Sequence, residues 1–445
     1  MDFHDPMNLS KSSIVDCSLK QNDNILDDNF QLNGDDNLFQ VKLNCQINDK
    51  EICAKVENSF KLAGDIITYA LVLHTPIIVD AVFGQMDPKV LGGATASRFI
   101  SITDDDDKER FYPQALVKQL QFPTQTSGYA DSDIKAQFNS LQNWYFPDDE
   151  GSIKEGQHEL LYTVLHELIH GLGFISSWKN HIDLQLQTPT RGLTPFVVTG
   201  SYVVPPALPD GSFEFTGFYE TIFDKFVVMN NNGDRNELST LTDELNQFSG
   251  RNKQFTQLSS FYNELQNSPQ FDAAKKVLSS STIKNSLIFL PKGSTNIQVD
   301  GLILETSLNT YVAGTSIVHA DLATYSNDSD FLMIYTGFVG ISMNEIIRKS
   351  GNRTGSAIGP KLLGVLNSIG YTIANNPIKP KSSTVSISIS NKPELDFFEL
   401  LFISFSFVLP GSIGEYTVGS KLFPIIVTLG LYGFVYSAVE YLQRK

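Results

Sequence analysis

The stretch HELIHGLGF, residues 166–174, constrains the possible folds and functions of this chain more than any other feature. Its two histidines stand four residues apart, and an α-helix places residues at this spacing on one face, a turn from each other. Leucine, isoleucine and valine around them give a broad apolar surface, so residues 157–175 are predicted to form a buried helix. Two imidazoles on one face of such a helix can bind the same metal ion.

Glu167 and Gly173 add to this interpretation. Glu167 projects beside His166 and His170, where its carboxylate can take a proton from a metal-bound water. Gly173 is a good helix stop, which lets a later segment turn back and supply a third ligand. Neutral imidazoles with an open position favour zinc (Zn²⁺), which lowers the pKa of its bound water and polarises a peptide carbonyl. Glu167 would then pass the proton to the leaving amine. The alternative is a buried helix in which HExxH occurs by chance.

The residues near the motif do not complete the site. In the compact pattern HExxHxxGxxH the third histidine falls at position 176, and this chain has Ser176 there. His181 and Asp183 follow closely, but their spacing matches no arrangement of ligands that we can justify. The third ligand is therefore expected from a distant segment.

Two distant residues are candidates for the third ligand. His319 lies in SIVHADLATY, and Glu220 lies in FYETIFDKF. If FYETIFDKF were a helix, Glu220 with Asp224 four residues later would form the gluzincin arrangement of a third ligand and its hydrogen-bonded partner. The local pattern leaves both possibilities open.

Several motifs in order resemble the leishmanolysin-type metzincins, a family of zinc metallopeptidases. These motifs are HELIHGLGF, a long insertion, SIVH at 316–319, FLM at 331–333 and LLGVLNSIGY at 362–371. The resemblance spans roughly residues 50–376 and implies that His166, His170 and His319 bind zinc, that Glu167 is the general base, and that Met333 forms a methionine turn below the metal. It also implies an α+β, metzincin-like fold with a mixed sheet and a long insertion, and hydrolysis of protein or peptide substrates.

The resemblance suggests two further features. Tyr335, just after the methionine turn, is a candidate donor to the oxyanion. An extended peptide substrate is expected along a sheet edge supplied by residues 74–84 or 133–146. Other expected elements are a helix at 54–71, a strand in 91–102 followed by an acidic loop, two polar helices between 240 and 278, and a helix ending at Gly370.

The chain divides into six predicted parts. These are a polar leader (1–49), an N-terminal catalytic subdomain (50–180), an insertion (181–310), a C-terminal catalytic subdomain (311–376), a Ser-rich linker (377–396) and an apolar tail (397–445). In the tail, Leu422–Val439 is 18 residues without a charge, close to the shortest membrane-spanning helix. We therefore expect a single-pass membrane protein with an extracytoplasmic catalytic domain, although no secretory signal is recognisable at the N-terminus.

Composition excludes some partners. The net charge of −16 argues against binding to nucleic acid and against simple adsorption to anionic lipid.

Cys45 and Cys53 could form a disulfide across a short loop, which would leave Cys17 without a partner cysteine. Sequons at Asn8, Asn327 and Asn352 weakly favour a secretory route.

Two other classes of protein remain open. The chain could be a catalytically inactive binding or adhesion module on a peptidase fold, but the intact Glu167 argues against this. It could also be a structural membrane protein with a chance motif, but then the glycines and the distal His–Met region would all be coincidences.

Overall fold

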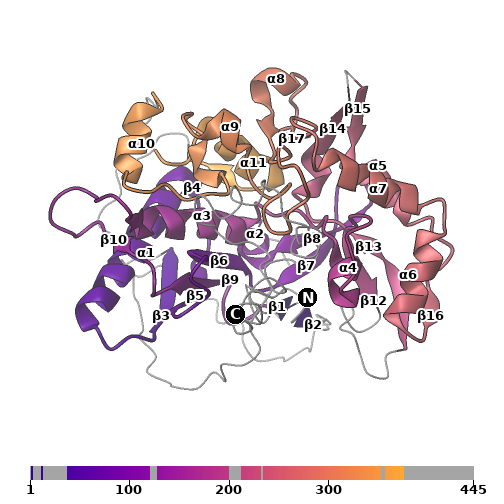
Figure 1. Cartoon of the computed structure of the whole chain (residues 1–445), viewed down its shortest axis with the longest axis horizontal. Helices are drawn as coiled ribbons and strands as arrows, with labels where there is room; N and C mark the ends of the chain where they lie inside the picture. The colour runs from indigo at the N-terminus through magenta and orange to yellow at the C-terminus, as the bar shows by residue number, and fades with distance from the viewer. Residues whose placement is uncertain are drawn as a thin grey trace, which may run out of the picture.

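The computed structural model describes residues 38–374 except 121–127, 200–211, 232–233 and 352–355, together with two short paired strands, β1 (Asp2–Phe3) and β2 (Ser12–Ser13). Sheets and helices are mixed along the chain, as in an α+β protein (Figure 1).

A four-stranded sheet and two helices form the N-terminal half. The strand order is β3 (Phe39–Cys45), β5 (Ile77–Gly84), β9 (Ile134–Asn139) and β6 (Gly92–Ala96). The first three strands run parallel, and β6 is antiparallel at the edge. Helices α1 (Lys50–Ala70) and α3 (Leu160–Leu172) pack against each other and against this sheet.

The sequence pattern explains most of these elements. Helix α1 begins four residues before the predicted start at 54, because the Asp49 side chain accepts hydrogen bonds from the backbone N–H groups of Glu51 and Ile52. Strand β5 confirms the strand predicted at 74–84. The polar leader predicted for residues 1–49 is wrong at its end, because strand β3 lies inside it. Its alternate residues Phe39, Val41 and Leu43 are buried, as expected for a strand that packs one face on a core.

The four-stranded sheet does not have the edge strands that were predicted to bind an extended peptide. Strand β5, within 74–84, and strand β9, within 133–146, both lie inside the sheet with a strand on each side. The end of 133–146 forms β10 (Trp144–Tyr145), which pairs with β11 (His158–Glu159) in a separate two-stranded sheet. The edges of the four-stranded sheet are β3 and β6, and the motif helix α3 packs against β6. Strand β6 comes from the Gly-Ala-rich stretch 91–102, which folds as two strands, β6 and β7 (Phe99–Thr103), rather than one.

The predicted insertion is more regular than its sequence indicated. A three-stranded sheet and a four-stranded sheet lie within it, with helices on the right of Figure 1. The elements of the insertion are α4 (His181–Leu186), β12 (Phe196–Thr199), β13 (Phe213–Tyr219), η1 (Asp224–Phe226), β14 (Val227–Asn231), β15 (Asp234–Glu237), α5 (Leu238–Leu245), β16 (Lys253–Phe255), α6 (Leu258–Gln266), α7 (Phe271–Ser280), β17 (Leu287–Phe289), α8 (Ile297–Asp300) and β18 (Leu302–Ile303). Before the insertion, the short elements β8 (Glu109–Pro113), α2 (Gln114–Gln119), β10 (Trp144–Tyr145) and β11 (His158–Glu159) complete the N-terminal half. Most of these strands are too short for a period-two pattern to stand out.

The C-terminal part returns to the motif helix. Its elements are α9 (Leu322–Tyr325), η2 (Phe331–Met333), α10 (Met343–Lys349), α11 (Pro360–Ile369) and β19 (Thr372–Ile373), which pairs with β4 (Leu71–Val72). Helix α11 confirms the predicted helix that ends at Gly370. The hydroxyl of Tyr371 donates to the carbonyl of Leu172, so the end of α11 supports the end of α3.

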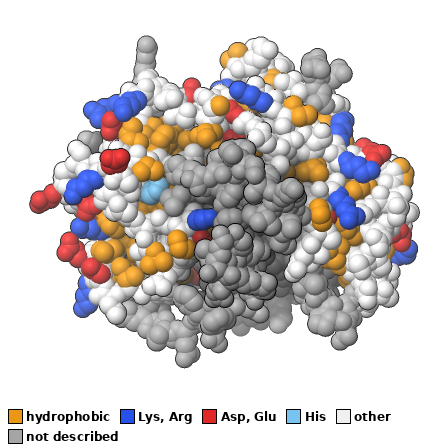
Figure 2. Space-filling view, in the orientation of Figure 1, with side chains coloured by type: hydrophobic (Ala, Val, Ile, Leu, Met, Phe, Trp, Pro, Cys, Tyr) orange, Lys and Arg blue, Asp and Glu red, His pale blue; other side chains and the backbone are white. Residues whose placement is uncertain are grey.

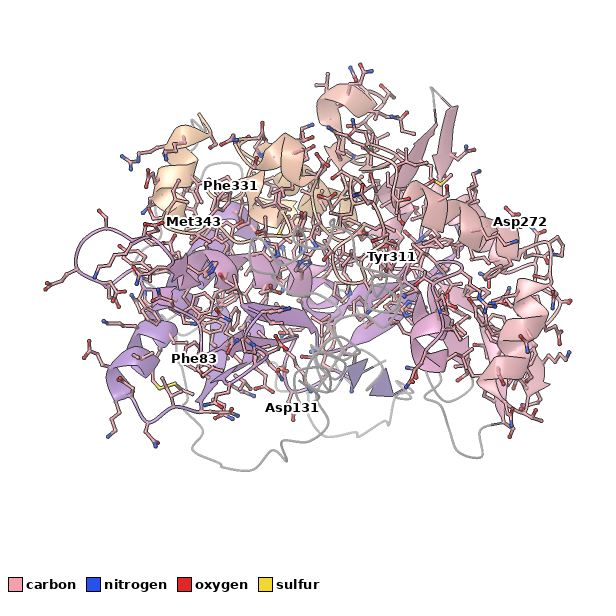
Figure 3. All side chains as sticks on the ribbon, in the orientation of Figure 1. Phe83, Asp131, Asp272, Tyr311, Phe331 and Met343 are labelled. Carbon is pink, nitrogen blue, oxygen red and sulfur yellow. A yellow bond between two sulfur atoms is a disulfide. The ribbon has the colours of Figure 1, made fainter. Side chains whose placement is uncertain are left out.

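Two sequence inferences about cysteines and membranes have different outcomes. Cys45 and Cys53 form the suggested disulfide, visible as the yellow bond beside α1 in Figure 3. The predicted membrane location is wrong on this structure, because no helix among the described residues is long and apolar enough to cross a membrane. The segment 422–439, on which that prediction rested, lies outside the described residues, as do the linker and Cys17.

Charged side chains of both signs are interspersed around the rim of the face shown in Figure 2. Among the described residues, Lys253 with Glu264 and Lys275 with Asp272 form exposed ion pairs. Exposed pairs of this kind contribute little to stability, at most about 1 kcal/mol each.

Candidate metal centre

Three histidines from two distant segments meet in the interior. The Nε2 atom of His319 lies 3.3 Å from the Nε2 atom of His166 and 3.3 Å from that of His170. All three side chains are fully buried. Helix α3 supplies the first two from one face, as the spacing predicted, and the segment between β18 and α9 supplies His319.

The other ring nitrogen of each histidine faces a backbone carbonyl. The three Nδ1 contacts are His166 with Leu332 at 2.6 Å, His170 with Phe174 at 2.8 Å and His319 with Thr315 at 3.1 Å. A carbonyl oxygen can only accept a hydrogen bond, so each Nδ1 must carry the proton. In a neutral imidazole the Nε2 atom is then the unprotonated nitrogen, which can bind a metal, and one ligand nitrogen of each histidine lies within 4.8 Å of the others.

Burial keeps these imidazoles neutral. It lowers the pKa of His170 to about 4, and it lowers the pKa of His166 and His319 well below the ordinary value of 6.5. The neighbouring histidines lower the pKa of His166 and His319 further, because two positive charges in one dry site repel each other. Neutral imidazole is the form that binds a metal.

The spacing of the nitrogens suits zinc. Zinc binds imidazole nitrogen at about 2.0–2.1 Å in tetrahedral geometry, which puts two ligand nitrogens about 3.3–3.4 Å apart. The two Nε2 separations of 3.3 Å agree with this edge length. The donor set and its spacing therefore fit a zinc ion held by three protein ligands.

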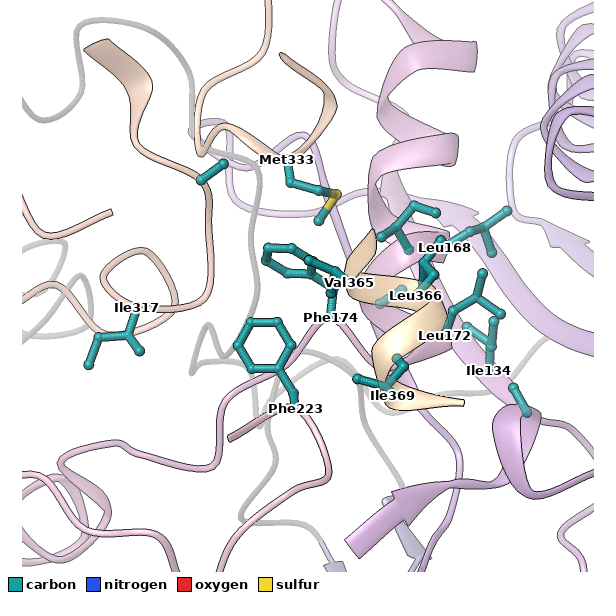
Figure 4. Close-up of a cluster of buried hydrophobic side chains, with 14 of the residues drawn as sticks. Ile134, Leu168, Leu172, Phe174, Phe223, Ile317, Met333, Val365, Leu366 and Ile369 are labelled. Atoms are coloured by element: carbon teal, nitrogen blue, oxygen red, sulfur yellow. The ribbon is translucent and has the colours of Figure 1, made fainter. Parts of the chain in front are cut away.

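Met333 lies in a turn that joins the two ligand-bearing segments. The carbonyl of its neighbour Leu332 accepts a hydrogen bond from His166, and the carbonyl of Met333 accepts one of 2.7 Å from the backbone N–H of Ala320, next to His319. The Met333 side chain is 1% exposed and lies above Phe174 in Figure 4. The turn thus positions both ligand segments through its backbone.

Glu167 is fully buried, and its Oε2 atom accepts a hydrogen bond of 2.9 Å from the backbone N–H of Ala94. Ala94 belongs to β6, so the carboxylate lies beside the edge strand of the sheet. This hydrogen bond restricts the rotation of the carboxylate beside the histidines.

The two glycines of the motif have different roles. Gly173 has φ 122° and caps α3, which confirms the predicted helix stop. Gly171 lies inside the helix, where a Cβ atom would stand 2.5 Å from Ile134 on β9. Gly171 therefore lets the motif helix approach the sheet closely.

The alternative third ligand, Glu220, is engaged elsewhere. Its carboxylate accepts hydrogen bonds from Arg110 at 2.6 Å, Ser239 at 2.5 Å and Thr242 at 2.8 Å. The helix that the gluzincin arrangement requires is absent from FYETIFDKF, because Glu220 follows β13 directly and Asp224 only begins the short 3-10 helix η1. Among the described residues, the group that includes His166, His170 and His319 does not include Glu220.

The other candidates also lie outside this group. His181 contacts the carbonyl of Ser177 through Nε2, and burial lowers its pKa to about 3. Asp183 accepts a hydrogen bond from Tyr262. Burial is the main cause that raises the pKa of Tyr335 to about 12, and the negative charge of Glu305 raises it further. The phenol of Tyr335 therefore stays protonated at neutral pH.

A second group of side chains that could bind a metal ion, Asp104, Asp105 and Asp106, lies nearer the surface. Its carboxylates form ion pairs with Arg110 and Lys225. Protein cations thus already neutralise much of this charge.

The sequence analysis did not identify the groups that hydrogen-bond to the three imidazoles. The acceptors for the imidazoles are main-chain carbonyls, which leave no signature in the sequence. Ile317 has φ 73°, a strained conformation for a β-branched residue, two positions before His319. Only the tertiary structure reveals this strain.

Comparisons with known proteins give a family but no activity. The family model described as SPBPB7E8-like matches residues 2–393. The uncharacterised protein PB7E8.01 of Schizosaccharomyces pombe is 24% identical over 410 residues, which cover 83% of this chain and 69% of that protein. No solved structure matches the chain.

Proposed function

This chain belongs to the SPBPB7E8-like family, and we propose that it is a zinc-dependent endopeptidase with His166, His170 and His319 as metal ligands. The observation that carries the proposal is the set of three unprotonated Nε2 atoms that lie close together in the interior. The lone pairs of nitrogens so arranged repel one another, and a cation between them turns this repulsion into attraction.

Zinc is the ion that these residues fit best. Imidazole nitrogen is a borderline donor that suits zinc, and three protein ligands leave a fourth position open, as in catalytic zinc sites. When bound, zinc acts as a Lewis acid that makes water more acidic and a peptide carbonyl more electrophilic.

Glu167 is the proposed general base. Its carboxylate takes a proton from the attacking water and delivers it to the leaving amine. The amide of Ala94 holds one carboxylate oxygen in place at 2.9 Å, so this group reacts from a defined position.

Strand β6 is the proposed edge for an extended peptide substrate. It ends the sheet order, and its residue Ala94 contacts Glu167, so a peptide lying along β6 passes close to the base. The sequence of edge strand, motif helix, distal histidine, methionine turn and closing helix supports a metzincin-like architecture of the leishmanolysin type.

The test combines metal analysis with a peptidase assay on the full chain. We expect about one zinc per chain and hydrolysis of an unfolded protein substrate. Glu167→Gln keeps the shape of the side chain but removes the proton acceptor, so hydrolysis should fall at least ~100-fold while zinc stays bound. Glu159→Gln is the matched control, because Glu159 is also buried at the start of α3 but hydrogen bonds to Met343.

Two results would contradict the proposal. A wild-type protein that does not bind zinc would exclude the metal centre. A protein that binds zinc but hydrolyses no peptide would favour the inactive binding module instead.

A further inference from the structure

The turn after the motif helix is held by a segment about fifty residues further along the chain. This turn comprises residues 174–177, and the holding segment comprises residues 221–224. The Thr221 hydroxyl lies 2.8 Å from the carbonyl of Ile175, and the rings of Phe174 and Phe223 pack with centroids 4.9 Å apart. Figure 4 shows these two rings next to each other below Met333, and their planes are tilted by 53°.

Asp224 is at the centre of this contact. Its Oδ2 atom accepts hydrogen bonds from the backbone N–H of Ser177 at 2.9 Å and from the Ser177 hydroxyl at 2.6 Å. It also accepts one from the backbone N–H of Thr221 at 3.0 Å. The side chain is fully buried, and a buried carboxylate with several donors locks the groups around it.

The holding segment is itself fixed to strand β8 of the two-stranded β7–β8 sheet. The N–H of Phe111 on β8 donates to the carbonyl of Glu220, and the N–H of Ile222 donates back to the carbonyl of Phe111. The buried ion pair between Arg110 and Glu220 adds to this attachment. Asp224 therefore acts from a rigid support.

The held turn in turn orients a histidine of the centre. The carbonyl of Phe174, the first residue of the turn, lies 2.8 Å from Nδ1 of His170. That contact selects the tautomer of His170 and sets the direction of its Nε2 atom. A shift of the turn would move this acceptor away from the imidazole.

We infer that Asp224 is a positioning residue of the metal centre: through Ser177 it fixes the turn 174–177, and through the Phe174 carbonyl it orients His170. This inference rests on the proposed function, because it takes His170 as a zinc ligand. It also gives the predicted insertion, to which Asp224 belongs, a part in building the centre.

The pKa of Asp224 agrees with this role. Burial raises it above the ordinary value, and hydrogen bonds from Ser176, Ser177 and Thr221 oppose the rise. The hydrogen bonds that fix the turn therefore also offset part of the free-energy cost of burying the Asp224 carboxylate.

The experiment measures zinc affinity by competition with a chromogenic chelator, using the full chain and the variants Asp224→Ala and Asp224→Asn. Removing a group that supports a metal ligand from outside the coordination sphere typically costs about 10–100-fold in affinity. Because Asp224 acts through one intervening turn, we expect about a tenfold loss for Asp224→Ala. The asparagine, which retains an acceptor for the Ser177 amide, should recover part of this loss.

Asp183→Ala is the matched control. Asp183 is 1% exposed, burial raises its pKa, and it accepts hydrogen bonds from Tyr262, Thr188 and Arg191, outside the turn 174–177. Its loss should destabilise the protein but leave zinc affinity within about twofold of the wild type. The visible spectrum of the cobalt-substituted protein should change in Asp224→Ala and not in Asp183→Ala, because it reports ligand geometry.

The outcomes separate the two proposals. Wild-type protein that does not bind zinc would overturn the proposed function and this inference together. Zinc binding by the wild type with unchanged affinity in Asp224→Ala, or with an equal loss in Asp183→Ala, would overturn only the inference. If Asp224→Ala does not fold, Ser177→Ala decides, because it removes only the hydroxyl bond: a smaller loss of affinity supports the inference, and no loss overturns it.

Discussion

At the scale of single residues, main-chain carbonyls determine which nitrogen of each histidine is available. The carbonyls of Leu332, Phe174 and Thr315 each accept a hydrogen bond from the Nδ1–H group of one imidazole, which leaves the three Nε2 atoms facing the centre. Side-chain identity alone would allow either tautomer. The metal-binding character of the site is thus shared between the histidines and their backbone acceptors.

His319→Ala tests the distal ligand. Removing it leaves two imidazoles for the metal, so zinc affinity and hydrolysis should both fall by at least ~100-fold. His158→Ala is the control, because His158 is also buried but lies outside the metal-binding group. Zinc content after dialysis and a peptidase assay measure the effect. Full zinc occupancy in His319→Ala would remove His319 from the centre, and zinc loss in Glu220→Gln would restore the alternative ligand.

At the scale of the element, the end of the motif helix depends on Gly173. Its φ of 122° suits glycine, and a Cβ atom there would lie 3.0 Å from Pro113 and 3.1 Å from Ile369. Gly173→Ala should therefore cost about 1–3 kcal/mol of stability and weaken zinc binding, since the Phe174 carbonyl follows directly. Gly151→Ala is the control, because Gly151 also has a positive φ, of 85°, but open space around it. Denaturant unfolding and zinc titration distinguish the two; equal behaviour of both variants would show that the position beside the metal centre has no special role.

Helix α11 begins against a buried acid. Asp330 is 2% exposed, and its Oδ1 atom accepts hydrogen bonds from the N–H groups of Lys361 at 2.8 Å and Leu362 at 3.0 Å. Burial raises its pKa from 3.8 to about 6. Between these values the folded state binds a proton that the unfolded state has released.

Asp330 therefore predicts a pH dependence of defined sign. Because the folded state binds more protons between pH 4 and pH 6, stability falls as pH rises through this range. The rise in the pKa of Asp330 from 3.8 to about 6 corresponds to at most about 3 kcal/mol of folding free energy. The stability of the wild type relative to Asp330→Asn should decline across this interval in urea unfolding at fixed ionic strength. Parallel profiles for the two proteins would show that Asp330 does not titrate in this way.

At the scale of the whole molecule, the centre connects segments that are far apart in sequence. His166 and His319 are separated by 153 positions, and the Met333 turn and helix α11 pack on the same motif helix. A metal bound there stabilises only the folded chain, because the unfolded chain does not present the three ligands together.

Removal of zinc should accordingly weaken the whole fold. With free zinc 1,000-fold above its dissociation constant, binding contributes about 4 kcal/mol, which a chelator should abolish. Urea unfolding with and without the chelator measures the difference. The variant His166→Ala should unfold identically in both conditions. If the wild type also unfolds identically, zinc does not bind the folded state.

The sequence by itself determined the local elements and the two helical histidines. The i, i+4 spacing of His166 and His170, the apolar helix around them and the stop at Gly173 are short-range properties, and the structure contains all three. Helices α1 and α11 and strand β5 were predictable for the same reason, since residue periodicity and capping residues act within a few positions.

Only the tertiary structure decided which distant groups meet. Both His319 and Glu220 were possible partners of the motif helix, but the chain folds His319 onto it and places Glu220 against Arg110. The sheet order, which puts β6 rather than β5 or β9 at the edge, is equally a matter of long-range pairing. Such contacts follow from the packing of the whole chain, and backbone acceptors such as the Phe174 carbonyl have no residue type by which a sequence could announce them.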